Sequence, residues 1–452
     1  MGALFGTDGI RGEANRYPIT PEVAMDVGRA VACLLKHNNR AHIVIGKDPR
    51  ISGDMIENAL AAGVCSAGGD VTMLGVIPTP AVAYLTRSMN CDAGIVVSAS
   101  HNPYYDNGIK IFDKNGFKLS TMVEEQIETE ILNRAVNCKD VRHDQIGTIR
   151  QLDDARDRYV DFIAGSGLSD YKLNGMKVVL DCSNGATYKV APMLFDRIGA
   201  KLTTLFNSPN GRNINDGCGS QHIETLQQKV LETGANVGLA FDGDGDRLIA
   251  VDETGKAVTG DQILAICAKQ MKETKNLANN MVVSTVMSNV GLKNLLAEEG
   301  IDHLITDVGD RYVLAEMQKS GAIIGGEDSG HMIFLDRHTS GDGILTGLRL
   351  IETMLETGRP LSELSKIMKV YPQILKNVKI KEKVDIYTFP EIAAVIRDVE
   401  TRLDGKGRVL VRYSGTQPLC RVMVEGPDRD ITEQLCDRII DVIAELIGTG
   451  KE

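Results

Sequence analysis

Hydrophobic positions up to about residue 370 alternate between two kinds of run. Short runs rich in Val, Ile and Ala predict buried strands, and amphipathic stretches with apolar residues three or four apart predict helices. Strands are expected at residues 41–48, 93–97, 177–181, 237–241, 281–286 and 322–324, and helices at residues such as 222–233, 262–272, 290–299 and 344–356. Strands that alternate with helices indicate βαβ units and largely parallel sheets, which is an α/β fold.

The pattern changes after about residue 371. A strand is expected at residues 374–380, a helix at 389–403, two strands at 408–413 and 420–425, and a last helix at 431–447, which is an α+β arrangement. A chain of 452 residues is too long for one hydrophobic core. Turn-rich seams lie at residues 164–175, 252–256 and 370–373. We therefore expect domains at residues 1–165, 166–254, 255–370 and 371–452.

Composition and charge narrow the class of protein. The formal charge of −11, without a basic cluster, argues against nucleic acid or an anionic membrane as a partner. No stretch is apolar enough to span a bilayer, and the first residues lack the features of a secretion signal, so we expect a cytoplasmic protein. The nine cysteines form no CxxC pair, which favours reduced thiols over a disulfide framework or a zinc site.

The most informative local pattern is FDGDGDR at residues 241–247, between two apolar runs. Asp242, Asp244 and Asp246 offer hard oxygen ligands to one Mg²⁺, and the glycines between them permit a tight turn. A solvated turn is the plainer alternative, but three carboxylates this close repel one another unless a cation neutralises them. An EF-hand is excluded because its sixth position is Arg247, where a glycine is needed, and because strands flank the loop.

A second pattern, SASHNP at residues 98–103, directly follows an apolar strand. A serine there is usually part of a turn or a helix cap. A serine hydrolase is disfavoured, because G-x-S-x-G is absent and His101 is poorly placed as a base for the adjacent Ser100. A phosphorylated Ser100 that faces the aspartate loop is favoured over a serine hydrolase, because Mg²⁺ would offset the charge of the phosphate.

Two further loops carry polar side chains. Arg412 and Arg421 flank a Ser-Gly-Thr turn, which suits the capture of a phosphate that is not transferred, although a plain hairpin has the same pattern. The stretch GGEDSGH at residues 325–331 places a carboxylate, a hydroxyl and an imidazole together, where they could bind vicinal sugar hydroxyls. Most lone histidines and glycine pairs are structural, so this second loop is weak evidence by itself.

Taken together, these motifs resemble those of one family, the α-D-phosphohexomutases, and within it the phosphoglucosamine mutases. The matching stretches are FGTDGIRG at residues 5–12, SASHNPYYDNGIK at 98–110, FDGDGDR at 241–247, VGDRY at 308–312 and RYSGT at 412–416. They occur in the same order over essentially the whole chain. The resemblance implies three related α/β domains with mixed sheets and a smaller C-terminal α+β domain around a central cleft.

The resemblance also implies a role for each motif residue. Ser100 is the phosphoserine, and one Mg²⁺ is held by Asp242, Asp244, Asp246 and a phosphoserine oxygen. The residues expected at the reacting centre are Arg11, His101, Lys110, Arg247 and His331, with Lys110 and His331 as candidates for proton transfer. The residues expected to bind substrate are Gly309, Asp310, Glu327, Asp328 and Ser329 in two loops, and Arg412, Ser414, Gly415, Thr416, Gln417 and Arg421 in the C-terminal domain. Gln417 and Asp328 depart from the family pattern, which usually has Glu and Gln there.

The implied activity is the interconversion of glucosamine 6-phosphate and glucosamine 1-phosphate through a bisphosphorylated sugar, which would feed UDP-N-acetylglucosamine and cell-wall precursor synthesis. The expected partner is therefore a phosphorylated aminosugar, with neither nucleic acid nor membrane, and a homodimer is left open. The alternatives are the same chemistry on glucose or mannose phosphates, and a sugar-phosphate sensor without turnover. An intact Ser100 with three aspartates argues against the sensor.

Overall fold

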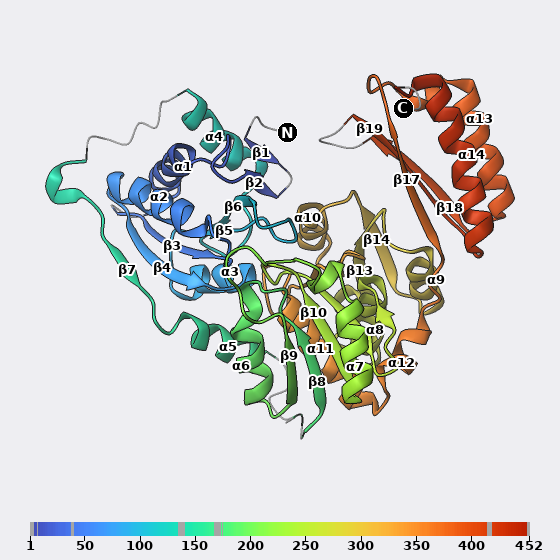
Figure 1. The fold of residues 1–452 in the computed structure, drawn as a ribbon, viewed down its shortest axis with the longest axis horizontal. Coiled ribbons are helices and arrows are strands. Elements are labelled where there is room, and N and C mark those ends of the chain that lie inside the picture. Colours follow the sequence, from blue (N-terminus) through green and yellow to red (C-terminus); the bar gives the residue numbers. More distant parts are fainter. Residues whose placement is uncertain are drawn as a thin grey trace. The chain divides into compact units, whose positions relative to one another are not determined.

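The computed structural model describes residues 4–449, apart from residue 7 and residues 38–39, 134–140, 167–172, 174 and 414–417. The chain forms two compact units, Met1–Met287 with Ile301–Ile367, and Ser288–Gly300 with Met368–Glu452. Figure 1 shows the helices and strands of both. Among the described residues, no helix is both long and apolar enough to cross a bilayer.

The first sheet has seven strands in the order β1-β2-β6-β5-β3-β4-β7. Its strands are β1 (Phe5–Gly6), β2 (Gly9–Glu13), β3 (His42–Lys47), β4 (Asp70–Val76), β5 (Ala93–Val97), β6 (Asp106–Asp113) and β7 (Ile149–Gln151). Its helices are α1 (Pro21–Leu34), α2 (Gly53–Ser66), α3 (Thr79–Ser88) and α4 (Thr121–Leu132). Strands β3, β4, β5 and β7 run parallel, whereas β6 is antiparallel to β5 and to β2, so the sheet is mixed.

Helices cover both faces of this sheet because successive residues of a strand point to opposite sides. On β3, Ile45 belongs to the core formed with α1, α2 and α4. The next residue, Gly46, faces α3, where a Cβ atom would lie 2.6 Å from Val82 Cγ2. The near-continuous apolar runs of β3 and β5 are therefore those of strands buried on both faces.

The second sheet has the order β12-β11-β10-β8-β9. Its strands are β8 (Lys177–Asp181), β9 (Lys201–Leu205), β10 (Val237–Phe241), β11 (Leu248–Asp252) and β12 (Ala257–Val258), and the helices near it are α5 (Ala155–Gly165), α6 (Val190–Arg197) and α7 (Glu224–Thr233). Strand β10 is parallel to β8 and antiparallel to β11. The β10–β11 connection therefore lies at the carboxyl end of a parallel pair, where ligands bind in open α/β sheets.

The third sheet has the order β14-β13-β15-β16. Its strands are β13 (Met281–Thr285), β14 (Asp302–Thr306), β15 (Ile324–Gly326) and β16 (Met332–Phe334), and the nearby helices are α8 (Gly260–Glu273), α10 (Asp310–Ser320), α11 (Gly343–Thr357) and α12 (Leu361–Leu364). Strand β13 is parallel to β14 and β15, and β16 is antiparallel to β15. This sheet is also mixed.

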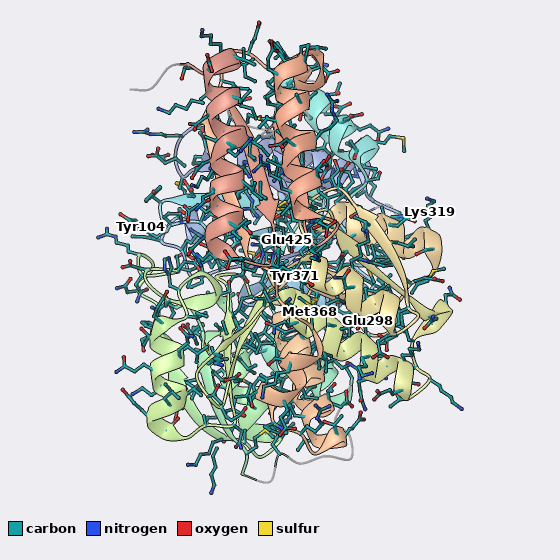
Figure 2. All side chains as sticks on the ribbon, turned by 90° about the vertical axis from the view of Figure 1, so that its right-hand side faces the viewer. Tyr104, Glu298, Lys319, Met368, Tyr371 and Glu425 are labelled. Atoms are coloured by element: carbon teal, nitrogen blue, oxygen red, sulfur yellow. The ribbon has the colours of Figure 1, made fainter. Side chains whose placement is uncertain are left out.

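The C-terminal unit has an antiparallel sheet in the order β17-β19-β18. Its elements are α9 (Val290–Glu298), β17 (Gln373–Lys379), α13 (Pro390–Leu403), β18 (Arg408–Tyr413), β19 (Leu419–Glu425) and α14 (Arg429–Ile447). Helices α13 and α14 lie side by side (Figure 2). Both share one hydrophobic core with the sheet. Glu425 accepts a hydrogen bond from Val290 N at 2.7 Å, and Asn289 donates to Tyr371 O at 2.8 Å, so the start of α9 belongs to this unit.

The expected fold class is confirmed: three α/β sheets of mixed direction and a smaller α+β domain. Strands β5, β8, β10 and β18 have the predicted bounds, whereas β15 begins at Ile324 instead of residue 322. Seven described cysteines are free, but Cys33 is disulfide-bonded, so the expectation of reduced thiols is wrong for that residue.

Candidate active site and metal centre

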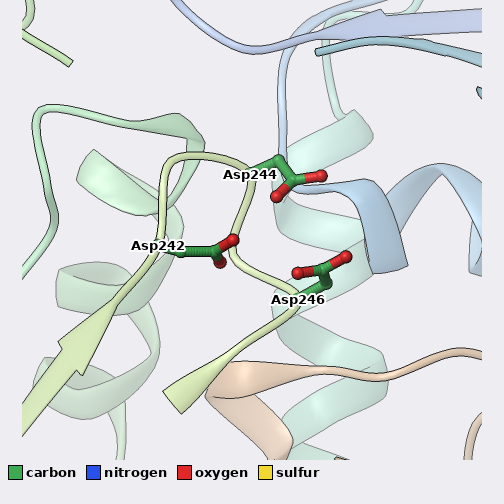
Figure 3. A group of neighbouring side chains, drawn as sticks. All are labelled: Asp242, Asp244 and Asp246. Carbon is green, nitrogen blue, oxygen red and sulfur yellow. The ribbon is translucent and has the colours of Figure 1, made fainter. Parts of the chain in front are cut away.

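The loop between β10 and β11 carries three aspartates whose carboxylate oxygens lie within 4.8 Å of one another. Figure 3 shows Asp242, Asp244 and Asp246 on this one loop. All three side chains are buried. The loop is tight because Gly245 adopts a φ of +75°, and a Cβ atom there would lie 2.5 Å from Thr187 Cγ2. The aspartates therefore converge on a single small volume.

The triad has the properties of a site for a divalent cation. Within the described part of the chain, Asp244 Oδ1 and Asp246 Oδ1 are buried and have no hydrogen-bond partner. Burial, together with the charges of Asp246 and Asp244, holds the pKa of Asp242 well above its ordinary value. A divalent cation would supply partners for the unpaired oxygens and would offset the repulsion among the carboxylates. The donor set therefore fits a divalent metal ion.

Two other elements hold the aspartate loop in place. Thr79, at the first residue of α3, donates from Oγ1 to Asp244 Oδ2 at 2.6 Å and from its backbone N to Asp244 O at 2.9 Å. Gly343, at the start of α11, donates to Gly245 O at 3.0 Å. Helix α3 of the first sheet and helix α11 near the third sheet therefore both contact this loop of the second sheet.

Ser100 faces the triad, as the sequence predicts. It follows β5, is 1% exposed, and donates from Oγ to Asp242 Oδ2 at 2.6 Å. His101 Nδ1 lies 3.4 Å from the same hydroxyl. Burial, with the charges of Arg247 and Arg11, lowers the pKa of His101 to about 4, so this imidazole is neutral at pH 7.

Lys110, on β6, is the cation that contacts the triad most closely. Its Nζ lies 2.8 Å from Asp244 Oδ2, 3.4 Å from Asp246 Oδ2 and 3.2 Å from Asp8 Oδ2. Burial disfavours the charged amine, but the carboxylates of Asp244 and Asp8 raise the pKa of Lys110 well above its ordinary value. Lys110 is therefore a fixed positive charge beside the aspartate triad.

Two arginines provide donors that protein groups do not use. Arg11 pairs with Asp8, and Arg247 Nε lies 3.9 Å from Asp246 Oδ1. Among the described residues, the Nε atoms of Arg11 and Arg247 are buried without a hydrogen-bond partner. Because an unpaired buried N–H group is costly, these atoms indicate an anionic ligand such as a phosphate.

His331 connects the triad to α10. Its Nδ1 lies 3.7 Å from Asp246 Oδ2, and its Nε2 lies 3.6 Å from Asp310 Oδ2. Burial opposes the imidazolium, but the charges of Asp246 and Asp310 raise the pKa of His331 above its ordinary value. The partly buried Lys118 forms ion pairs with both Asp310 and Asp8. A chain of alternating charges therefore extends from the aspartate loop to the N-terminal motif.

The predicted sugar loop is held by two helix starts. Glu327 Oε1 accepts a hydrogen bond from Gly309 N at 3.1 Å, where α10 begins. Asp328 Oδ1 accepts one from Asp261 N at 3.3 Å, in the first turn of α8. Ser329 is exposed. Gly309 therefore lies next to Glu327. The contact of Asp328 with Asp261 could not be predicted from the sequence.

In the C-terminal unit, Arg412 on β18 lies directly opposite Arg421 on β19. Side chains of directly opposed residues project from the same face of a sheet, and two like charges placed this way repel each other. Arg421 Nε is buried without a hydrogen-bond partner in the described part of the chain. Ser414, Gly415, Thr416 and Gln417 lie outside the described residues. The arginine pair is suited to bind an anion.

Several residues at this site were not found from the sequence. They are Asp8 and Lys118, which link the charged groups, Thr79, which holds Asp244, and Arg50 and Asn215, which bind the Ser100 loop. Asp8 and Lys118 are ordinary charged residues in the sequence, and only their ion pair in the folded chain distinguishes them. Asp8 lies in the stretch FGTDGIRG, in which only Arg11 was predicted to be a site residue.

Four family models match the chain in order. They are described as phosphoglucomutase/phosphomannomutase, alpha/beta/alpha domains I, II and III and C-terminal domain, and they match residues 2–137, 157–255, 259–371 and 375–442. The crystal structure of a phosphoglucomutase/phosphomannomutase family protein from Burkholderia thailandensis has the same fold, with a TM-score of 0.80 and 24% identity over 98% of this chain and 97% of that one.

Curated relatives match over their full length. The phosphoglucosamine mutase of Syntrophus aciditrophicus (strain SB) is 56% identical over 451 residues, which are 99% of this chain and 100% of the relative. The phosphoglucosamine mutase of Syntrophobacter fumaroxidans (strain DSM 10017 / MPOB) is 55% identical over 449 residues, again 99% and 100%. The chain therefore belongs to the phosphoglucomutase/phosphomannomutase family, in which these relatives are phosphoglucosamine mutases.

Proposed function

We propose that this protein is a mutase that interconverts glucosamine 6-phosphate and glucosamine 1-phosphate through a phosphorylated Ser100. One observation carries the proposal: the Ser100 hydroxyl lies 2.6 Å from Asp242, within a buried triad of carboxylates. A nucleophile in contact with a metal site is the arrangement that phosphoryl transfer through an enzyme serine requires.

The metal ion is proposed to be one Mg²⁺, held by Asp242, Asp244, Asp246 and a phosphate oxygen on Ser100. Three carboxylates without nitrogen or sulfur ligands favour a hard cation that coordinates oxygen. When bound, the ion would offset negative charge on the phosphoryl group.

The bond between Ser100 Oγ and phosphorus breaks while a sugar hydroxyl forms a new bond to phosphorus. The hydroxyl proton leaves to a base, and the departing serine oxygen takes up a proton, so that the net transfer is of one proton from the sugar hydroxyl to Ser100. His331 and Lys110 are the two candidates proposed for proton transfer. The high pKa of Lys110 favours a permanent charge that stabilises the transferring group together with Arg11 and Arg247. The neutral His101 lies beside the reacting oxygen.

The bisphosphorylated sugar then turns round and returns its other phosphate to Ser100. Gly309, Asp310, Glu327, Asp328 and Ser329 are proposed to bind the sugar. Arg412 and Arg421, with Ser414, Gly415, Thr416 and Gln417, are proposed to bind the phosphate that is not transferred. The proposed domains remain residues 1–165, 166–254, 255–370 and 371–452.

A coupled assay with purified protein, Mg²⁺ and a panel of hexosamine and hexose phosphates tests the function. Turnover of glucosamine phosphate, together with a phosphate on Ser100 in intact-protein mass spectrometry, is the expected result. Equal turnover of glucose or mannose phosphate would make the protein a general phosphohexomutase. Binding of sugar phosphate without any turnover would make it a sensor.

A further inference from the structure

Arg50 uses its whole side chain to hold the loop that carries Ser100. A guanidinium has five N–H groups, and each of those of Arg50 has an acceptor. Nε donates to Asp48 Oδ2 at 2.8 Å, Nη1 donates to Pro103 O and to Asp106 O at 3.0 Å, and Nη2 donates to Ser100 O at 2.9 Å and Asn102 O at 2.8 Å. The side chain is fully buried. Arg50 therefore fixes the loop from within the first α/β domain.

Asn215 holds the same two carbonyl groups from the second α/β domain. Its Nδ2 donates to Ser100 O at 2.9 Å and to Asn102 O at 3.0 Å. Its own backbone is fixed, because Asn215 N donates to Ser183 O at 2.9 Å. Arg50 and Asn215 therefore donate hydrogen bonds to the same two carbonyl groups, one from each of two domains.

The geometry of Ser100 depends on such support. Its φ is +52°, a left-handed conformation that a residue with a side chain keeps only when its surroundings hold it. The aspartate loop packs on the same carbonyl, since a Cβ atom on Gly243 would lie 2.5 Å from Ser100 O. The Ser100 carbonyl is therefore in contact with the aspartate loop as well as with Arg50 and Asn215.

We propose that Arg50 and Asn215 are positioning residues for phosphoryl transfer. By fixing the carbonyls of Ser100 and Asn102 from two domains, they hold the serine oxygen in line with the triad without touching the sugar. The inference rests on the proposed function of Ser100. Misplacement by a fraction of an ångström slows a transfer step much more than it weakens substrate binding.

Asn215→Asp is the sharpest test, because it keeps the shape of the side chain and replaces both donors by an acceptor. Asn213→Asp is the matched control on the same loop, since Asn213 Nδ2 donates to Ser208 O and not to the serine loop. Each full-length protein is loaded at Ser100 with a ³²P-labelled sugar bisphosphate and Mg²⁺. Transfer to glucosamine 6-phosphate is then followed in a single turnover, so the rate refers only to loaded and folded enzyme.

We expect Asn215→Asp to slow transfer by at least about tenfold, with KM within about threefold of the wild type, and Asn213→Asp to leave both unchanged. Arg50→Lys keeps the charge but has three donors instead of five, and should also slow transfer. If Arg50→Lys does not fold, Asn215→Asp decides alone. A wild-type transfer rate in Asn215→Asp, or a raised KM with an unchanged rate, overturns the inference. Normal turnover in Ser100→Ala would instead overturn the proposed function.

Discussion

Asp328 caps the start of α8: its Oδ1 lies 3.3 Å from the backbone N of Asp261, and its backbone O lies 3.1 Å from Gly260 N. The first N–H groups of a helix have no partner inside the helix, so this carboxylate satisfies one of them and places a negative charge at the positive end of the helix dipole. Asp328, in the predicted sugar loop, therefore has a structural role as well as any role toward substrate.

The two roles of Asp328 can be separated by substitution. Asp328→Asn keeps an acceptor for Asp261 N and should leave thermal stability nearly unchanged, whereas Asp328→Ala should lower the free energy of unfolding by about 1 kcal/mol. If the carboxylate attracts the cationic 2-amino group, the wild type should prefer glucosamine phosphate over glucose and mannose phosphates by at least about tenfold in kcat/KM, or about 1.4 kcal/mol.

Asp328→Asn should then reduce that preference while activity on glucose phosphate stays similar. The measurement is kcat/KM of each variant on the three substrates. A strong preference that survives Asp328→Asn would show that the amine is recognised elsewhere.

Ser100→Ala should reduce mutase turnover to below about 1% of the wild type and leave the fold intact, because the covalent relay needs a hydroxyl at this place. Ser183→Ala is a matched control. Ser183 is also buried, has a φ of +51° and follows a buried strand, but its Oγ donates to Cys182 O. Ser183→Ala should therefore retain mutase turnover. Comparable losses in both variants would point to backbone strain rather than to the missing nucleophile.

Asp244→Asn should raise the Mg²⁺ concentration needed for half-maximal activity by at least about tenfold, since it removes one anionic ligand. Asp216→Asn, in an exposed loop, serves as the control. The measurement is a Mg²⁺ titration of activity after chelation of bound metal. Full activity of the wild type in chelated buffer would make the aspartate loop a structural turn.

Arg421→Ala and Arg412→Ala should each raise KM by at least about tenfold with a smaller effect on kcat, because a charge-assisted contact to the distal phosphate is lost. Arg438→Ala, on the outer surface of α14, removes the same charge from the same unit and should leave KM unchanged. Unchanged KM values in both test variants would show that this arginine pair does not bind the substrate.

Asp342 should make the stability of the protein depend on pH. Burial raises its pKa to about 6, and its hydrogen bonds with Leu345 N and Tyr159 only partly offset that effect. Because the folded pKa lies above the unfolded value, the protonated form is favoured in the folded state. The contribution of Asp342 to stability is therefore complete below about pH 4 and is lost as the pH rises through about 6.

This loss amounts to about 3 kcal/mol, because the folded pKa of about 6 lies above the ordinary value of 3.8. Asn also caps helices, so Asp342→Asn should remove the loss while α11 stays formed. The measurement is urea unfolding of the wild type and Asp342→Asn at pH 4.5 and 7. A difference between the two proteins that does not change with pH would contradict the assignment.

The features that depend on neighbours in the chain can be predicted from the amino-acid sequence. Apolar runs such as those of β5 and β10 specify buried strands, and the Asp-Gly alternation after Phe241 specifies a tight anionic loop. Both follow from local hydrophobicity and backbone freedom. The pairing of Ser100 with that loop was also predicted, because a phosphoserine and a metal site each need the other. The short strands β1 and β2 were not predicted, since Gly, Asp and Arg interrupt their apolar pattern.

Which residues hold the reacting groups in place can be seen only in the tertiary structure. Asn215 reaches the Ser100 carbonyl across 115 positions of the sequence, and Lys118 reaches Asp310 across 192. Asp328 meets Asp261 across 67. Each contact satisfies a buried polar group that has no local partner, and such a requirement arises only after the sheets have packed. The type of a residue shows whether its side chain can donate or accept a hydrogen bond. Only the folded chain shows which group is its partner.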